Sequence, residues 1–221
     1  MIKDNLLKVQ STIVSPARLI AVSKTKPVEA VQEAYEAGQR LFGENHALEM
    51  RDKHAVLPQD IEWHFIGHLQ SNKVKYIAPF VSLIHSIDSL GLLQVVDKEA
   101  AKNDRTIDCL LQFHVAAEET KFGLNKEEAQ ALLPHLTEME HVHIVGIMGM
   151  ATNTDDEDRV RADFKQLKAI FDWLKNSYFA NDAAFRELSM GMSGDYMIAL
   201  QEGSTMVRVG SAIFGARNYD L

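Results

Sequence analysis

One lysine stands where a short apolar segment meets an expected helix start. The segment 18–23 is typical of a buried strand, and Lys24 follows it directly. Pro27, three residues after Lys24, suits the first position of a helix. In an extended strand Lys24 shares a face with Ile20 and Val22, at the rim of an apolar interior, where an amine loses its proton more easily than in water. A neutral amine can form a Schiff base, although a solvated loop lysine is the ordinary alternative.

Two turns that combine glycine with a hydroxyl residue follow the last two expected strands. The first contains Gly191, Met192 and Ser193, and the second contains Gly210 and Ser211. Glycines let the backbone approach a ligand closely, and Ser193 is positioned to cap the short helix that follows it. Either turn alone is a weak signal because such pairs are common in loops. Together they predict a phosphate site.

Arg208 precedes the second turn, on a strand that should be buried. A buried arginine needs a partner, which is either a structural carboxylate or a ligand. The lysine, the two turns and the arginine match the aldehyde, phosphate and ring nitrogen of pyridoxal 5′-phosphate. If Arg208 faces the ring nitrogen, its permanent charge keeps that nitrogen unprotonated and weakens the ring as an electron sink. This arrangement would disfavour demanding carbanion chemistry.

Strands and helices alternate along the whole chain. The strands are expected at 18–23, 40–45, 61–67, 81–87, 106–115, 143–150, 187–192 and 206–211. Helices are expected at 27–37, 46–56, 71–77, 89–102, 125–133 and 195–200, with weak helical character at 2–14. Thr154 and Glu157 have the spacing of a capping box for a long amphipathic helix that runs through Leu174.

This alternation predicts an α/β protein with parallel strands. Eight units in 221 residues favour a closed (β/α)8 barrel that spans 1–221 as a single domain with an extra N-terminal helix. An open doubly wound sheet is the alternative, but no Gly-x-Gly-x-x-Gly follows the first strand. Chemistry in a barrel lies at the C-terminal ends of the strands, where Lys24 is expected.

Composition limits the classes of function. The chain has 31 acidic and 23 basic residues, a net charge of −8, which argues against a nucleic-acid-binding surface. Cys109, the single cysteine, excludes an internal disulfide and suits a core position in a reducing cytoplasm. No stretch approaches a membrane span, and the N-terminus lacks a secretion signal. His64 and His68 have a metal-like spacing but fall on a strand and its loop, so no metal site is expected.

Several long strings resemble the pyridoxal phosphate homeostasis proteins. The resemblance runs from about residue 18 to 217, with the motifs in the same order. The motifs are Ala21-Val22-Ser23-Lys24-Thr25-Lys26-Pro27, Phe42-Gly43-Glu44-Asn45, His64-Phe65-Ile66-Gly67-His68-Leu69-Gln70-Ser71-Asn72-Lys73, Gly191-Met192-Ser193, and 204–217, which contains Arg208-Val209-Gly210-Ser211.

The resemblance implies a barrel similar to the N-terminal domain of alanine racemase, the type III fold of pyridoxal phosphate proteins. It implies a Schiff base at Lys24 and an arginine, Arg208, near the pyridine nitrogen. Ser193, Gly210 and Ser211 would hold the phosphate, and Asn45 and Met192 would line the pocket. Ser211 stands where the family usually has threonine, which keeps the hydroxyl. Lys121 matches a family lysine in the loop after the fifth strand, where a solvated lysine is the favoured interpretation.

The resemblance also implies a function. Such a protein binds pyridoxal phosphate and helps to keep the free aldehyde in balance in the cytoplasm, without robust turnover, and apoenzymes that use the cofactor are candidate partners. A monomer is expected, and a chain ending at Leu221 leaves no room for the second domain, which supplies a tyrosine base in alanine racemase. The alternatives are a weak amino-acid racemase, and a barrel enzyme whose lysine forms an imine with a phosphorylated sugar.

Overall fold

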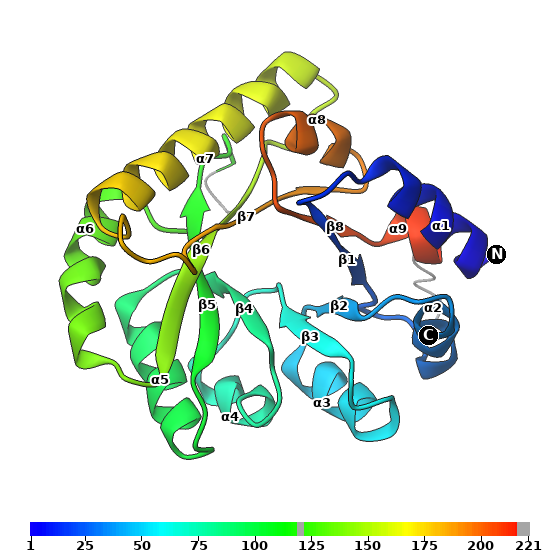
Figure 1. The fold of residues 1–221 in the computed structure, drawn as a ribbon, viewed down its shortest axis with the longest axis horizontal. Helices are drawn as coiled ribbons and strands as arrows, with labels where there is room; N and C mark the ends of the chain where they lie inside the picture. The colour runs from blue at the N-terminus through cyan, green and yellow to red at the C-terminus, as the bar shows by residue number, and fades with distance from the viewer. Residues whose placement is uncertain (119–121, 216–221) are drawn as a thin grey trace.

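The strands close into a parallel barrel in the order in which they occur along the chain. In the computed structural model, which describes residues 1–118 and 122–215, each strand pairs with its neighbours in sequence and β8 pairs with β1 (Figure 1). The strands are β1 (Arg18–Val22), β2 (Leu41–Glu44), β3 (Glu62–Phe65), β4 (Leu83–Ile87), β5 (Ile107–His114), β6 (Val142–Met150), β7 (Glu187–Met192) and β8 (Met206–Val209). The predicted barrel is confirmed, and the open sheet is wrong.

Helices surround the barrel and cover its outer face (Figure 1). They are α1 (Ile2–Thr12), α2 (Val28–Glu36), α3 (Ala47–Val56), α4 (Val74–Ile77), α5 (Leu90–Ala101), α6 (Lys126–Leu132), α7 (Glu157–Ser177), α8 (Tyr196–Gln201) and α9 (Ser211–Phe214), with short 3-10 helices η1 (Ser71–Lys73) and η2 (Leu133–Glu138). The extra N-terminal helix packs beside α9, where the Asn5 amide donates to the Ile213 carbonyl at 3.1 Å. Within the described residues no helix is both long enough and apolar enough to span a membrane.

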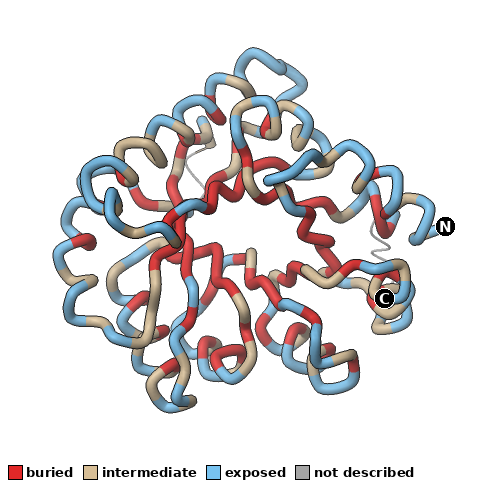
Figure 2. The backbone as a smooth tube through the Cα atoms, in the orientation of Figure 1, coloured by how far each residue is buried: buried red, intermediate tan, exposed pale blue. Residues whose placement is uncertain are grey.

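The barrel wall separates two buried layers. The larger layer lies between strands and helices and contains Phe42, Trp63 and Phe164, each fully buried. The smaller layer contains Ile20, Leu83, Leu110, Val145, Met148 and Met206. Figure 2 shows the ring of buried strands inside the more exposed helices. Cys109 is buried in β5, as expected for a small core residue.

Strand alternation determines which side chains enter the barrel. Ile20 on β1 pairs with Arg208 on β8, and both point to the same face of the wall as Met206. The inward row of β1 consists of every second residue, Ile20 and Val22. Lys24 lies four residues beyond Ile20 and therefore continues this inward row past the end of the strand. The pairing brings the first and last strands together, so residues from opposite ends of the chain meet at one mouth of the barrel.

Helix starts differ in detail from the predictions. Pro27 occupies the N-cap position with φ −68° and ψ 161°, so α2 begins at Val28 rather than at the proline. The capping box predicted from Thr154 and Glu157 is wrong, because the Asp156 carboxylate accepts from the amides of Asp158 and Arg159 and caps α7 itself.

Asn125, where the sequence predicts a helix to start, is the N-cap of α6. The Asn125 side chain accepts from the amide of Glu128 at 2.8 Å, and the Glu128 side chain accepts from the amide of Asn125 at 2.8 Å. This reciprocal pair satisfies two of the amides that a helix start leaves without partners.

Alanine at Gly146 is expected to break the seam between β6 and β7. An added Cβ would lie 1.8 Å from the Glu187 carbonyl oxygen, which belongs to the paired strand and cannot move independently. We expect Gly146→Ala to lower the free energy of unfolding by about 3 kcal/mol, measured by urea unfolding. Gly91→Ala is the matched control, because its Cβ would meet open space at the start of α5 and should be neutral or stabilising. Equal losses in both variants would contradict the packing at Gly146.

Candidate functional site

A cavity of about 300 Å³ opens at the C-terminal ends of the strands. This size is at the lower end for sites that bind small molecules. All seven residues predicted to bind a cofactor line it, namely Lys24, Asn45, Met192, Ser193, Arg208, Gly210 and Ser211. The remaining lining residues are Val22, Lys26, Ile66, Met150, Gly194 and Gly215. The structure therefore brings together residues that the sequence places at opposite ends of the chain.

Lys24 and Lys26 both line the cavity but lie in different surroundings. Lys24 is half-buried and follows Ser23, whose amide still donates to the Gly43 carbonyl at 3.0 Å as the strand ends. The Lys26 amine donates to the carbonyls of Phe214 and Gly215 at 3.1 and 3.2 Å. Lys26 is thus held against the end of α9, whereas Lys24 continues the inward row of the barrel.

The two glycine turns are hydrogen-bonded to each other. The Ser193 hydroxyl oxygen accepts from the Gly210 amide at 3.1 Å, so its own proton remains for a further acceptor. The prediction that Ser193 caps the following helix is wrong, because α8 begins later, after Asp195. Gly191 has φ +95°, and its Cβ would lie 2.6 Å from the Ala199 Cβ, so only glycine fits there.

Arg208 is a buried cation whose side chain borders the cavity. Its guanidinium donates to the Ser189 hydroxyl at 2.5 Å and to the Gly149 carbonyl at 3.0 Å. Burial lowers the pKa of Arg208 to about 10, with the charge of Asp195 acting in the opposite direction, so the group stays protonated at neutral pH. Among the described residues Arg208 forms no ion pair, and it also lines the cavity.

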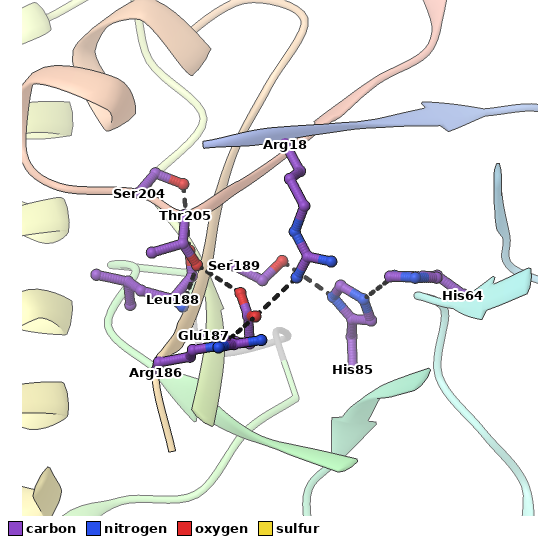
Figure 3. Close-up of polar contacts among 9 residues, drawn as sticks. All are labelled: Arg18, His64, His85, Arg186, Glu187, Leu188, Ser189, Ser204 and Thr205. Atoms are coloured by element: carbon purple, nitrogen blue, oxygen red, sulfur yellow. Dashed lines mark hydrogen bonds and ion pairs between the residues drawn. The ribbon is translucent and has the colours of Figure 1, made fainter. Parts of the chain in front are cut away.

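Two histidines extend this contact through the interior of the barrel. Ser189 Oγ lies 2.9 Å from His85 Nδ1, and His85 Nε2 lies 2.9 Å from His64 Nδ1 (Figure 3). Burial lowers the pKa of His64 to about 3 and holds the pKa of His85 well below its usual range, so both rings are neutral. A continuous chain of neutral polar groups therefore backs the guanidinium of Arg208.

A separate ion pair lies at the opposite end of the barrel. Arg18 donates to Glu187 at 2.7 Å, and the Thr205 hydroxyl donates to the same carboxylate at 2.9 Å (Figure 3). These residues stand at or near the N-terminal ends of β1, β7 and β8. This ion pair therefore lies away from the cavity at the C-terminal ends of the strands.

Asn45 and Met192 form part of the cavity wall. The Asn45 side-chain oxygen is buried and has no hydrogen-bond partner among the described residues, although buried polar atoms are normally bonded. Met192 is 39% exposed and contributes an apolar edge. Lys121 lies outside the described residues. No cluster of metal-ligating side chains occurs in the described ranges, and His64 instead belongs to the chain behind Arg208.

The fold and the lysine-bearing mouth define a barrel of the alanine racemase N-terminal type. The family model described as "Alanine racemase, N-terminal domain" matches residues 1–218. Alanine racemase from Bartonella henselae shares the fold, with a TM-score of 0.71 at 19% identity over 100% of this chain and 60% of the racemase chain.

Within that class, the chain belongs to the family of pyridoxal phosphate homeostasis proteins. The relative so named in Aquifex aeolicus is 40% identical over 92% of this chain and 88% of the relative. The relative in Pasteurella multocida is 36% identical over 99% and 98%. PipY of Synechococcus elongatus, solved with pyridoxal phosphate bound, has a TM-score of 0.88 at 36% identity over 97% of this chain and 100% of PipY. The resemblance inferred from the sequence is confirmed.

Replacing His64 with glutamine is expected to reduce the acid sensitivity of the fold. The folded state holds the pKa of His64 at about 3, whereas the ordinary value is 6.5. Below pH 6.5 the unfolded chain binds a proton that the folded state refuses, so the wild type loses stability as the pH falls. Relative to His64→Gln, the wild type loses about 1.4 kcal/mol of unfolding free energy for each pH unit. Urea unfolding between about pH 6 and pH 4.5 measures this loss.

Glu44 titrates with the opposite sign in the same range. Burial raises the pKa of its carboxyl from 4.5 to about 7, so the folded state binds an extra proton and gains stability as the pH falls. Both proteins keep Glu44, and the comparison therefore removes its contribution. His46→Gln, which removes an exposed histidine, is the matched control. Parallel pH curves for the wild type and His64→Gln would contradict a neutral buried ring at His64.

Proposed function

We propose that this protein binds pyridoxal 5′-phosphate at the mouth of the barrel, in a Schiff base with Lys24, and takes part in the intracellular balance of that cofactor. The observation that carries the proposal is the convergence of Lys24, the two hydroxyl turns and the buried Arg208 on one cavity of about 300 Å³. Family membership and the pyridoxal phosphate bound to PipY support it.

The residues of the cavity suit each part of the cofactor. The aldehyde of pyridoxal phosphate condenses reversibly with amines. The neutral amine of Lys24 would supply the electron pair for the carbon–nitrogen double bond, with loss of one water molecule. Ser193, Gly210 and Ser211 would bind the phosphate through hydroxyls and the backbone of the turn.

The remaining wall residues suit the ring. Arg208 would direct a permanently charged donor toward the ring nitrogen, since the residue lines the cavity. The buried oxygen of Asn45 lacks a donor among the described residues, and a ring substituent with a proton would provide one. Met192 would cover an apolar edge of the ring. Among the features of this cavity, the buried oxygen of Asn45, unpaired within the described part of the chain, is the one that favours a bound ligand.

The same site favours storage and release over catalysis. A ring nitrogen faced by the charged Arg208 remains unprotonated, which makes the ring a poor sink for electrons from a carbanion. We therefore propose that the protein, a single domain over residues 1–221, acts without robust turnover. We propose further that it works as a cytoplasmic monomer that exchanges the cofactor with apoenzymes. The family name of its relatives supports a role in homeostasis.

Removal of the Lys24 amine should abolish the covalent link. We expect the protein mixed with pyridoxal phosphate to develop a visible imine absorbance that Lys24→Ala lacks, because no other cavity residue then continues the inward row. Lys26→Ala is the matched control and should keep the band, since the Lys26 amine is engaged with the end of α9. Borohydride reduction and peptide mapping should label Lys24; a colourless wild type or a label on Lys26 would refute the assignment.

Amino-acid racemisation separates the proposed role from its enzymatic alternative. With L-alanine and pyridoxal phosphate, we expect the protein to produce no more D-alanine than free cofactor at the same concentration. The physical reason is the poor electron sink that a charged Arg208 would enforce. Chiral chromatography measures the product, with Lys24→Ala as the matched control. Turnover well above the free cofactor, and lost in Lys24→Ala, would establish a weak racemase instead.

A further inference from the structure

A buried group of charged residues lies between the barrel wall and α3. The side chains of Glu44 and Lys53 are 0% and 6% exposed, and that of Glu49 is 24% exposed. The Lys53 ammonium donates to the Glu44 and Glu49 carboxylates at 2.8 and 2.7 Å, and to the Ser23 carbonyl at 2.7 Å. All three of its protons are therefore used. We refer to Lys53, Glu44 and Glu49 as the clamp.

Buried ion pairs often add little stability, because desolvation of both charges offsets their attraction. The clamp accordingly calls for another explanation than stability. The contacts with the backbone suggest one. The Lys53 ammonium and the Glu49 carboxylate both bind backbone atoms, and those atoms lie in the short segment directly after β1.

The clamp holds the residues on both sides of Lys24. Before Lys24, the Ser23 carbonyl accepts from Lys53, and the Ser23 hydroxyl donates to Glu44 at 2.6 Å. After Lys24, the Thr25 amide donates to Glu49 at 2.6 Å. The clamp therefore fixes the peptide groups that determine the direction in which the Lys24 side chain leaves the end of β1.

The backbone after Lys24 adopts a conformation that needs such support. Thr25 has φ +62°, in the left-handed region that β-branched residues rarely occupy. Conformations of this kind persist when surrounding contacts determine them. The hydrogen bond from the Thr25 amide to Glu49 is such a contact, and Glu49 is itself fixed by Lys53.

We propose that Lys53, Glu44 and Glu49 are positioning residues, which hold the turn around Lys24 so that its amine, rather than that of Lys26, meets the aldehyde in the cavity. The proposal rests on the proposed function, since it assumes that Lys24 forms the Schiff base. It adds a reason for the choice between two lysines that line the same cavity.

The test measures both the rate and the site of attachment in the full-length protein. Glu49→Ala removes the acceptor of the Thr25 amide, and Glu49→Gln keeps an oxygen in its place. We expect Glu49→Ala to slow the appearance of the imine band by about tenfold and to move part of the borohydride label from Lys24 to Lys26. Glu49→Gln should recover most of the rate and return the label to Lys24.

Lys53→Met tests the centre of the clamp. The variant should behave like Glu49→Ala, and Lys168→Met is its matched control, because Lys168 forms an i,i+4 ion pair with Asp172 within α7. Circular dichroism and urea unfolding establish that each variant is folded. If Lys53→Met does not fold, the partly exposed Glu49 variants decide the question.

Two failures are distinguishable. Unchanged rates, with the label wholly on Lys24 in folded Glu49→Ala, would overturn the positioning role and leave the proposed function intact. Absence of an imine band in the wild type would overturn the proposed function and the positioning role together.

Discussion

The buried charge of Arg208 is the constraint around which the barrel interior is organised. A cation in an apolar interior is costly unless its donors are satisfied. Ser189 and the Gly149 carbonyl accept from it, and Ser189 is held in turn by His85 and His64. Neutral imidazoles supply donors and acceptors without adding a second charge. Arg208, Ser189, His85 and His64 therefore form one connected set that ends at the cavity.

A second polar set lies outside the wall and serves a different part of the mouth. Lys53, Glu44 and Glu49 bind Ser23 and Thr25 on either side of Lys24, whereas the histidines support the side chain of Arg208 on β8. Strands β1 and β8 are neighbours, with Ile20 beside Arg208. The two polar sets thus meet where β1 and β8 close the barrel. One set fixes the turn around Lys24 and the other fixes the guanidinium of Arg208, and both residues line the same cavity.

The sequence could predict what depends on local pattern. Apolar runs separated by amphipathic helices identify all eight strands, and glycine beside a hydroxyl identifies both turns. The sequence does not predict the histidine chain, because a lone polar residue such as His85 within an apolar strand does not indicate its partner. The role of Lys53 is not predicted either, because the periodicity of a polar helix does not reveal that the Lys53 ammonium is buried. Helix starts shifted where a nearer carboxylate, that of Asp156, competes for the same amides.

The hydrogen bond between Ser193 and Gly210 makes the last two turns of the barrel a single mechanical unit. The Gly210 turn adjoins the end of β1, where a Cβ added at Gly210 would lie 3.1 Å from the Val22 carbonyl oxygen. A ligand group bound by the Ser193 hydroxyl would therefore act on a turn that lies beside the strand leading to Lys24.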